Sequence, residues 1–163
     1  LVGALLKMAK IDAHAIEFIK KDIKTSELLE AVNPSVAILL DINNQKLILK
    51  NDSVISCDKQ WTVEALTNLV KNAIEYSPKD SEIEIDSGGN PLYSWISVKD
   101  SGAGMSREQY AALFKRFEYS TNENGFGIGM PLALSIVKGQ GGDIDIDFGN
   151  YGCGTTFIIK FFK

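Results

Sequence analysis

The sequence has few of the residues that form covalent cross-links, metal clusters or contacts with acidic polymers. It contains one histidine, and its two cysteines, Cys57 and Cys153, are far apart and form no CxxC pair. We therefore expect two reduced thiols rather than a disulfide framework or a zinc site. The formal net charge is −4 and the lysines are scattered, which argues against binding to nucleic acid or to an anionic membrane surface. No apolar run approaches the roughly 20 residues that span a bilayer.

What the chain does have is enough length and apolar content for a folded domain. Its 163 residues are 45% hydrophobic and 23% charged, which are ordinary values that allow a core without disulfides. The sequence begins at Leu1 rather than Met, inside a helical pattern. We therefore expect a fragment of a longer protein, in which residues 1–13 end one helix and residues 14–163 form a single domain.

Hydrophobic periodicity predicts helices and strands along the whole chain. One helix is expected near residues 25–39, where Pro34 predicts a kink or a break. Another is expected to begin after Asp58 as its cap and to end before Pro78. Shorter helices are expected at residues 106–117 and 129–140. Alternation predicts strands at residues 15–23, 46–50, 54–57, 82–86, 93–99, 143–148 and 155–161.

The connections between these strands predict the fold class. The segments 46–50 and 54–57 surround a short turn, and between the segments 82–86 and 93–99 the five residues 87–91 form a turn that is typical of a hairpin. Thr25 or Ser26 is expected to cap the helix that follows the first strand. Antiparallel strand pairs with helices gathered elsewhere predict an α/β sandwich, in which helices pack on one face of a mixed, mostly antiparallel sheet.

Two amides stand four residues apart on the helix that follows Asp58. Asn68 and Asn72 project from the same helical face, beside the apolar stripe and therefore at the edge of the core. An amide oxygen is a suitable ligand for Mg²⁺, which takes its other ligands from water and substrate phosphates. Taken alone, the pair is more simply read as two amides at the edge of the core.

Three glycine-rich segments have the composition of nucleotide-binding loops. In residues 100–104, Asp100 could accept a hydrogen bond from an exocyclic amine such as that of adenine, and the glycines let the backbone approach a flat base. Residues 125–129 precede a helix whose N-terminus could receive phosphate oxygens. A polar loop rather than a strand comes before them, which excludes a dinucleotide-binding fold. Residues 152–156 alone indicate a hairpin turn.

Taken in order, these segments resemble the motifs of the GHKL ATPase superfamily, and within it those of the sensor histidine kinases. Residues 66–77 resemble the N box and residues 113–117 the F box, while residues 100–104, 125–133 and 152–157 resemble the three glycine boxes. The resemblance covers roughly residues 10–162. It implies a Bergerat-type ATP-binding fold, with ATP and Mg²⁺ as cofactors, in the catalytic domain of a histidine kinase.

The resemblance also implies roles for individual residues. Asn72 would hold the Mg²⁺ that bridges the phosphates, Asp100 would bind the adenine amino group, and residues 105–126 would form a lid. Asn68 and Lys71 would act near the phosphates together with Asn72. Further implied nucleotide contacts are Tyr76, Gly102, Gly104, Met105, Phe117, Gly125, Gly127, Ile128, Gly129, Met130 and Thr156.

Asn68 favours a kinase over an ATPase. The hydrolysing relatives carry a glutamate at this position that activates water, whereas an amide takes up no proton near neutral pH. Phosphoryl transfer still works without a strong base, because it depends mainly on positioning and charge neutralisation. Glu75 and Tyr119 stand where the family usually has basic residues, so we expect a modest ATP affinity that depends strongly on Mg²⁺.

His14 is not the expected phosphate acceptor. In the family, the acceptor lies on the first helix of a dimerising hairpin, whereas residues 10–15 resemble the end of the second hairpin helix. We expect the acceptor upstream of Leu1, so this chain would bind ATP without phosphorylating itself. The implied partners are that hairpin, in a homodimer, and a response regulator. The implied location is the cytoplasmic part of a membrane-anchored kinase, with no contact of this chain with membrane or nucleic acid.

Two other functions stay open at this point. A serine kinase of the anti-sigma type shares the glycine boxes, although the helical start of the chain argues against it. A nucleotide-binding regulatory module without transfer activity is compatible with the missing basic residues.

Overall fold

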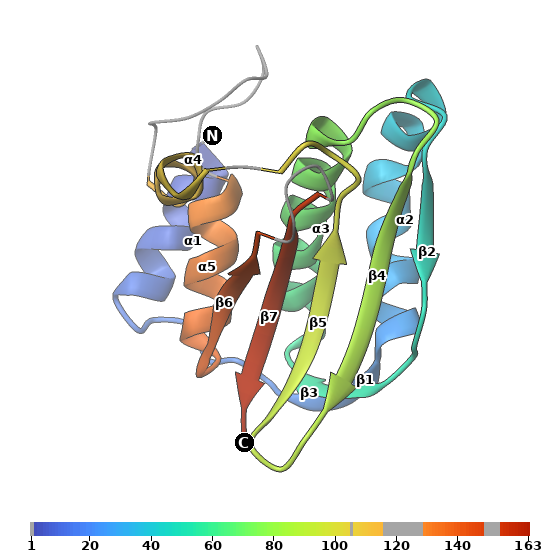
Figure 1. Ribbon diagram of the computed structural model, residues 1–163. Helices are drawn as coiled ribbons and strands as arrows, with labels where there is room; N and C mark the ends of the chain where they lie inside the picture. Colours follow the sequence, from blue (N-terminus) through green and yellow to red (C-terminus); the bar gives the residue numbers. More distant parts are fainter. Residues whose placement is uncertain (1, 105, 116–128, 149–153) are drawn as a thin grey trace.

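The chain folds into a five-stranded sheet with a layer of helices on one face, in a computed structural model that describes residues 2–104, 106–115, 129–148 and 154–163 (Figure 1). The strands of this sheet lie in the order β2 (Lys46–Leu49), β4 (Glu82–Gly89), β5 (Tyr93–Lys99), β7 (Thr156–Phe162) and β6 (Gly142–Asp147). β2 runs parallel to β4, and every other neighbouring pair is antiparallel. The sheet is therefore mixed and mostly antiparallel, as expected.

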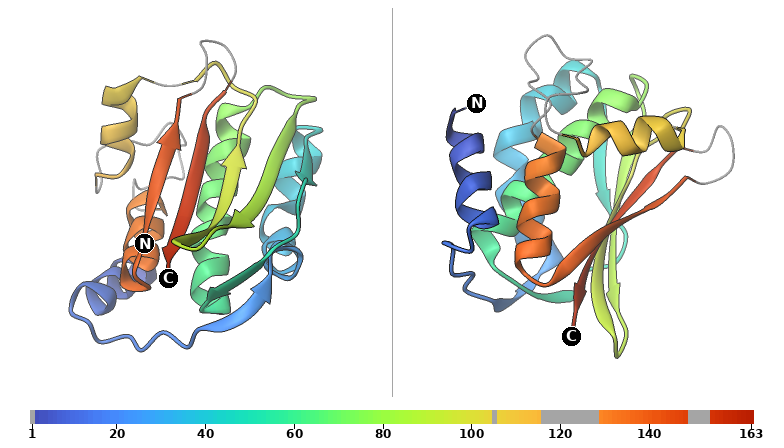
Figure 2. Two further views of the ribbon diagram at one scale, coloured as in Figure 1. Left: turned by 60° about the horizontal axis from the view of Figure 1, so that its bottom comes forward. Right: turned by 90° about the vertical axis from the view of Figure 1, so that its left-hand side faces the viewer.

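The long helices all lie on the same side of this sheet, as the edge-on view shows (Figure 2). They are α1 (Val2–Asp12), α2 (Thr25–Ile42), α3 (Lys59–Tyr76) and α5 (Gly129–Gly139). A short helix, α4 (Arg107–Leu113), crosses the upper end of the molecule. Within the described ranges, none of the helices combines the length and the apolar character that crossing a membrane requires. The other face of the sheet is left uncovered by the elements that the structure describes.

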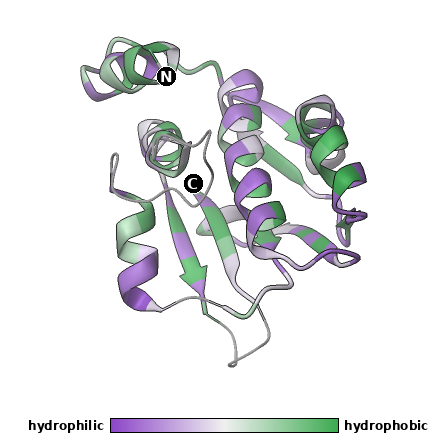
Figure 3. Cartoon of the chain, turned by 90° about the horizontal axis from the view of Figure 1, so that it is seen from above, coloured by the Kyte–Doolittle hydropathy of each residue, from purple (hydrophilic) through white to green (hydrophobic). Residues whose placement is uncertain are grey.

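Alternation along the strands separates a buried face from an open one. Most residues that turn toward the helices at the centre of the sheet are apolar and fully buried, and each of these contributes roughly 1.5–3 kcal/mol through burial. The helices carry hydrophobic residues together with hydrophilic ones (Figure 3), which fits elements with one covered and one exposed side. The central members of this core are Leu66, Leu69, Ile83, Ile85, Ile96, Phe157 and Ile159.

The two short strands around residues 51–53 belong to different sheets, which the sequence did not indicate. β3 (Val54–Cys57) pairs antiparallel with β1 (Lys21–Lys24), whereas β2 joins β4 in the main sheet. The connection between them also caps α2, because the backbone N–H of Ser26 donates to Asp52 Oδ1 (2.9 Å). The expected side-chain cap at Thr25 or Ser26 was wrong, and so was the expected start of the first strand at residue 15.

α2 continues unbroken through Pro34, where a kink or a break was expected. Proline removes the hydrogen bond to the carbonyl of Glu30, four residues earlier. Both residues lie on the exposed side of the helix, so water can satisfy that carbonyl and the buried side keeps its packing.

The remaining boundaries differ from expectation by a few residues. The β4–β5 connection is shorter than expected, because Asn90 Oδ1 accepts from the backbone N–H groups of Leu92 and Tyr93 and closes a tight turn. α4 ends at Leu113 rather than at residue 117. Cys57 is a free, buried thiol, while Cys153 lies outside the described residues.

Candidate functional site

The start of α3 is fixed by Asp58, as the sequence predicts. Its Oδ1 accepts from the backbone N–H of Trp61 (3.2 Å), and its Oδ2 accepts from that of Ile19 (2.8 Å). One carboxylate therefore caps the helix and also holds the segment that leads in from α1. Within this helix, Asn68 and Asn72 face the same side because they are four residues apart.

Asn72 is a buried amide with an unused acceptor. Its side chain is only 8% exposed, and its Oδ1 has no hydrogen-bond partner among the residues that the structure describes. A buried polar atom without a partner costs roughly 1–3 kcal/mol. Such a cost is typical of an atom whose partner is a ligand.

Asn68 lies one turn earlier, against the N-terminus of α5. A β-carbon added to Gly129, the first residue of that helix, would lie 3.2 Å from Asn68 Oδ1. The first N–H groups of a helix have no partner within it and attract anions. Met130 follows Gly129 and is buried. The structure thus brings an amide and a helix N-terminus together, as a phosphate-binding site requires.

Asp100 follows the last residue of β5 and is almost fully buried, with 3% of its surface exposed. The backbone N–H groups of Gly102 and Thr155 both donate to its Oδ1, each at 3.0 Å. Burial raises the pKa of the Asp100 carboxyl, and these two hydrogen bonds oppose the rise. Oδ2 accepts none of the hydrogen bonds recorded among the described residues, so one carboxylate oxygen can serve a ligand.

Glycine is required where the Asp100 loop meets the end of α3. A β-carbon on Gly102 would overlap the carbonyl oxygen of Tyr76. Next to it, the backbone N–H of Ser101 donates to Ser77 Oγ (3.0 Å). The Asp100 loop, which continues to Gly104, is therefore fastened to the C-terminal end of α3.

A second glycine closes this site from the last hairpin. Gly154 has a positive φ of 82°, and a β-carbon there would overlap the carbonyl oxygen of Asp100. Thr155 comes next and is 1% exposed. Its buried Oγ1 has no hydrogen-bond partner within the described part of the chain. Thr155 therefore lies beside Asp100.

Thr156 does not lie there. It pairs with Lys99 at the start of β7 and lines a groove on the open face of the sheet. Thr156 therefore faces away from Asp100, while Thr155 faces toward it, because neighbouring residues on a strand face opposite sides. The sequence already indicated this orientation, because Thr155 lies two and four residues before the core residues Phe157 and Ile159 and so faces the same side of the strand as they do.

The start of α5 and the Asp100 loop adjoin α3 at two points along its length, so the candidate site follows this helix. Asn68, Asn72 and Tyr76 follow each other at four-residue spacing, and eight residues of helix span about 12 Å. One end meets Gly129 and the other meets Gly102. An elongated ligand with an anionic end and an amine-bearing flat end fits this arrangement.

The donor set near Asn72 fits Mg²⁺ only together with a ligand. Within the described ranges, no three His, Cys, Asp or Glu side chains gather to hold a metal ion. Mg²⁺ usually keeps several waters and is shared with substrate phosphates, so one protein oxygen is enough to position it.

A family model shows what kind of protein has this arrangement. The model described as histidine kinase-, DNA gyrase B- and HSP90-like ATPase matches residues 57–163, which include α3, Asp100 and α5. The chain belongs to this family.

Relatives and solved structures narrow the likeness to histidine kinases. Sporulation kinase C from Bacillus subtilis is 34% identical, with 97% of this chain and 36% of the relative covered. Sensor protein SrrB from Staphylococcus aureus is 29% identical, with 98% and 28% covered. The catalytic domain of histidine kinase ThkA matches with a TM-score of 0.73 and 26% identity, over 91% of this chain and 97% of that one. These matches confirm the predicted resemblance to sensor histidine kinase catalytic domains and do not favour the serine kinase alternative.

A further structure supports the fold alone. The Acinetobacter baumannii histidine kinase AdeS matches with a TM-score of 0.83 at 22% identity, over 99% of this chain and 76% of that one. The chain spans about a third of the length of the curated relatives it matches.

The structure also places the other expected site residues of this ATPase-family domain. Lys71 is exposed on α3, next to Asn72. Glu75 is exposed on the same helix, and burial of part of its carboxyl raises its pKa. His14 is exposed just after α1, with a positive φ of 55°, as expected for a linker residue. The expected contacts at Met105, Phe117, Gly125, Gly127 and Ile128, and the lid residues Glu118 and Tyr119, lie outside the described residues.

Two contributors to the site were not expected from the sequence. Ser77 receives the hydrogen bond that fastens the Asp100 loop, and the Thr155 backbone holds Asp100 Oδ1. Both act through contacts between segments that are distant in the sequence, so no local pattern marks them.

Proposed function

We propose that this chain binds Mg-ATP between Asp100 and the N-terminus of α5, and transfers the γ-phosphoryl group to a histidine outside the chain. The observation that carries the proposal is the unpartnered, buried Oδ1 of Asn72. It lies on α3 between an end that can take phosphate and an end that can take a base. The bound ATP would extend along this helix.

At the base end, Asp100 would recognise adenine. Its Oδ1 is occupied by two backbone N–H groups, which leaves Oδ2 to accept from the exocyclic amine. An ionised carboxylate accepts and cannot donate, so the site would prefer an amino group to a carbonyl group at that position. Thr155 Oγ1, buried and unpartnered nearby, would add a second polar contact.

At the phosphate end, Asn72 Oδ1 would hold one Mg²⁺ together with phosphate oxygens, and this ion would neutralise part of the charge on the phosphates. Asn68 would orient a terminal phosphate oxygen beside the N–H groups at the start of α5. Neither amide can remove a proton from water near neutral pH, which suits a site that keeps ATP intact until a protein nucleophile arrives. Lys71 would approach the phosphates from the exposed side of α3.

The wider role follows from the likeness to sensor kinases. The acceptor histidine would lie on a dimerising hairpin that precedes α1 in the whole protein, and a response regulator would then receive the phosphoryl group. We place the chain in the cytoplasmic part of a membrane-anchored kinase. Residues 1–13 would be the end of the second hairpin helix, and residues 14–163 would be the catalytic domain.

The test is a transfer assay on the whole protein with radiolabelled ATP and Mg²⁺. We expect phosphate that is stable in alkali and lost in acid, as phosphohistidine is, and none on His14 when the present chain is incubated alone. Asn72→Ala should abolish the labelling, whereas Asn33→Ala, which removes an exposed amide from α2, should leave it intact. Acid-stable phosphate, or phosphohistidine at position 14, would contradict the proposal.

A further inference from the structure

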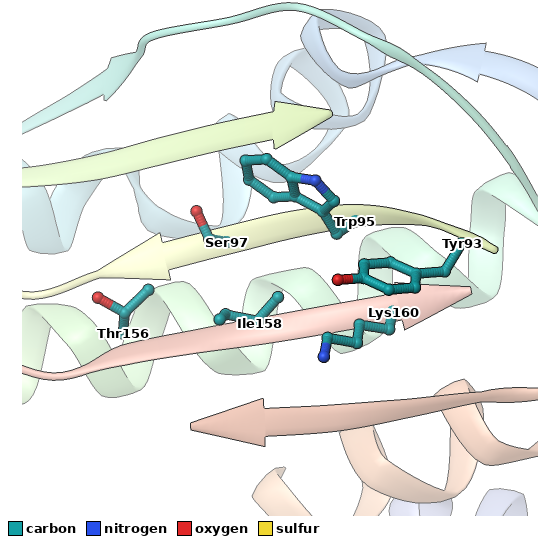
Figure 4. A pocket seen from close by; sticks show the side chains of 6 residues that line it. All are labelled: Tyr93, Trp95, Ser97, Thr156, Ile158 and Lys160. Atoms are coloured by element: carbon teal, nitrogen blue, oxygen red, sulfur yellow. The ribbon is translucent and has the colours of Figure 1, made fainter. Parts of the chain in front are cut away.

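The open face of the sheet carries a groove of about 310 Å³ between β5 and β7. Tyr93, Trp95 and Ser97 line it from β5, while β7 contributes Thr156, Ile158 and Lys160 (Figure 4). Its wall is thus partly aromatic and aliphatic, on the face of the sheet that the described helices leave uncovered. Asn68 and Asn72 belong to the helix layer on the other side, so the groove is separate from the proposed ATP site.

Aromatic side chains form part of the wall of the groove. The indole of Trp95 lies over Gly88 of β4, where any side chain would overlap the ring. At the end of the groove that Tyr93 lines, the rings of Tyr93 and Phe162 are packed edge to face, with their centres 6.1 Å apart. Phe162 is 54% exposed. Tyr93 and Trp95 are half-buried, and adjoining aromatic side chains that reach the surface are typical of protein-binding sites.

One side of the groove is acidic. Along the edge strand β6, Ile144 turns into the core, while Asp143 and Asp145 lie on the open face beside Lys160 and Ile158 of β7. The ammonium of Lys160 binds Asp145 and lies 4.8 Å from the centre of the Tyr93 ring. Two carboxylates therefore face one ammonium on this side of the groove, which leaves it with a net negative charge.

We propose that this groove docks a basic amphipathic segment of another protein. An aliphatic or aromatic side chain of that segment would lie against Trp95 and Ile158, and lysine or arginine side chains would face the aspartates of β6. A cationic partner follows from the acidic rim, and a peptide rather than a small molecule follows from the open, strand-long shape of the site. The docking does not depend on ATP, so it can fail or succeed independently of the proposed kinase function.

Tryptophan fluorescence gives a direct test, because the chain has two tryptophans. Trp61→Phe leaves Trp95 as the single reporter, and phenylalanine preserves an aromatic contact with Phe18. A synthetic amphipathic peptide of lysine and leucine should then bind saturably and shift the Trp95 emission to the blue. The same peptide with glutamate in place of lysine should not bind.

Variants locate the binding. Asp143→Asn combined with Asp145→Asn should weaken the lysine–leucine peptide about tenfold. Glu27→Gln combined with Glu30→Gln removes the same charge from exposed positions of α2 and should leave the affinity unchanged. Equal loss in both double variants, no shift of Trp95, or peptide-induced NMR shifts confined to the helix layer would overturn the proposal. So would self-association of the free chain through this face, which would show that a second copy is the occupant.

Discussion

Asp100 is a buried carboxylate whose two oxygens differ in their hydrogen bonds. Oδ1 accepts from two backbone N–H groups, and in our proposal Oδ2 would accept from the adenine amino group. Asp100→Asn keeps an acceptor for the backbone but presents an amide donor to the adenine amine. We expect ATP affinity to fall by about 2–3 kcal/mol, or roughly 30- to 150-fold, when measured by calorimetry.

The same substitution should leave the fold intact or make it more stable. A buried charge is costly, so the amide should raise the melting temperature of the free protein or leave it unchanged. Asp41→Asn, an exposed substitution on α2, is the control and should alter neither property. Normal ATP binding by Asp100→Asn would remove Asp100 from the site.

The raised pKa of Asp100 predicts how ATP binding depends on pH. A protonated carboxyl cannot accept from the adenine amine at the oxygen that carries the proton, so affinity should fall as pH drops through the raised pKa. The folding stability of the nucleotide-free protein should change with pH in the opposite direction, because burial disfavours the ionised form of Asp100. The cost to stability is therefore present at neutral pH and fades as pH falls toward about 3.9, the ordinary value. Calorimetric titrations across this range should show the loss in the wild type and not in Asp100→Asn.

At the scale of elements, α3 carries most of the site, and Asp58 fixes where it begins. Asp58→Ala removes the cap and also the acceptor for Ile19. We expect a loss of about 1–3 kcal/mol in the free energy of unfolding, measured by denaturant or thermal unfolding. Asp58→Asn retains one acceptor and should lose less. Equal stability of Asp58→Ala and the wild type would show that the cap contributes nothing.

The type and order of most helices and strands could be predicted from the sequence, but not all of their pairing. The stripe of α3, the glycine boxes and the alternation of β4, β5 and β7 are local patterns, so their type and order were predictable. The separation of β2 from β3 was not predictable, because pairing partners are chosen by contacts between distant segments. The placement of Thr156 on the open face was also hard to predict, because a shift of one residue along a strand moves a side chain to the other face.

At the scale of the whole molecule, α1 is joined to the catalytic domain by burial. The family model begins at residue 57, yet Met8 and Ile11 of α1 are 1% and 6% exposed and belong to the same core cluster. Met8→Ala should therefore cost about 2–5 kcal/mol in the free energy of unfolding. Leu6→Ala, at a position that is 54% exposed, should cost less than about 0.5 kcal/mol. A cost for Met8→Ala as small as that for Leu6→Ala would mean that α1 does not pack on the domain in solution.

In our proposal, ATP is held at one end by Asp100 and at the other through a metal ion on Asn72. The decisive measurement is a calorimetric titration of the wild-type chain with ATP, first in Mg²⁺ and then in EDTA. We predict modest binding in Mg²⁺, because Glu75, which is exposed on α3, would add negative charge near the phosphates, and binding at least about tenfold weaker in EDTA. Tight binding that is equally strong in EDTA would contradict the account.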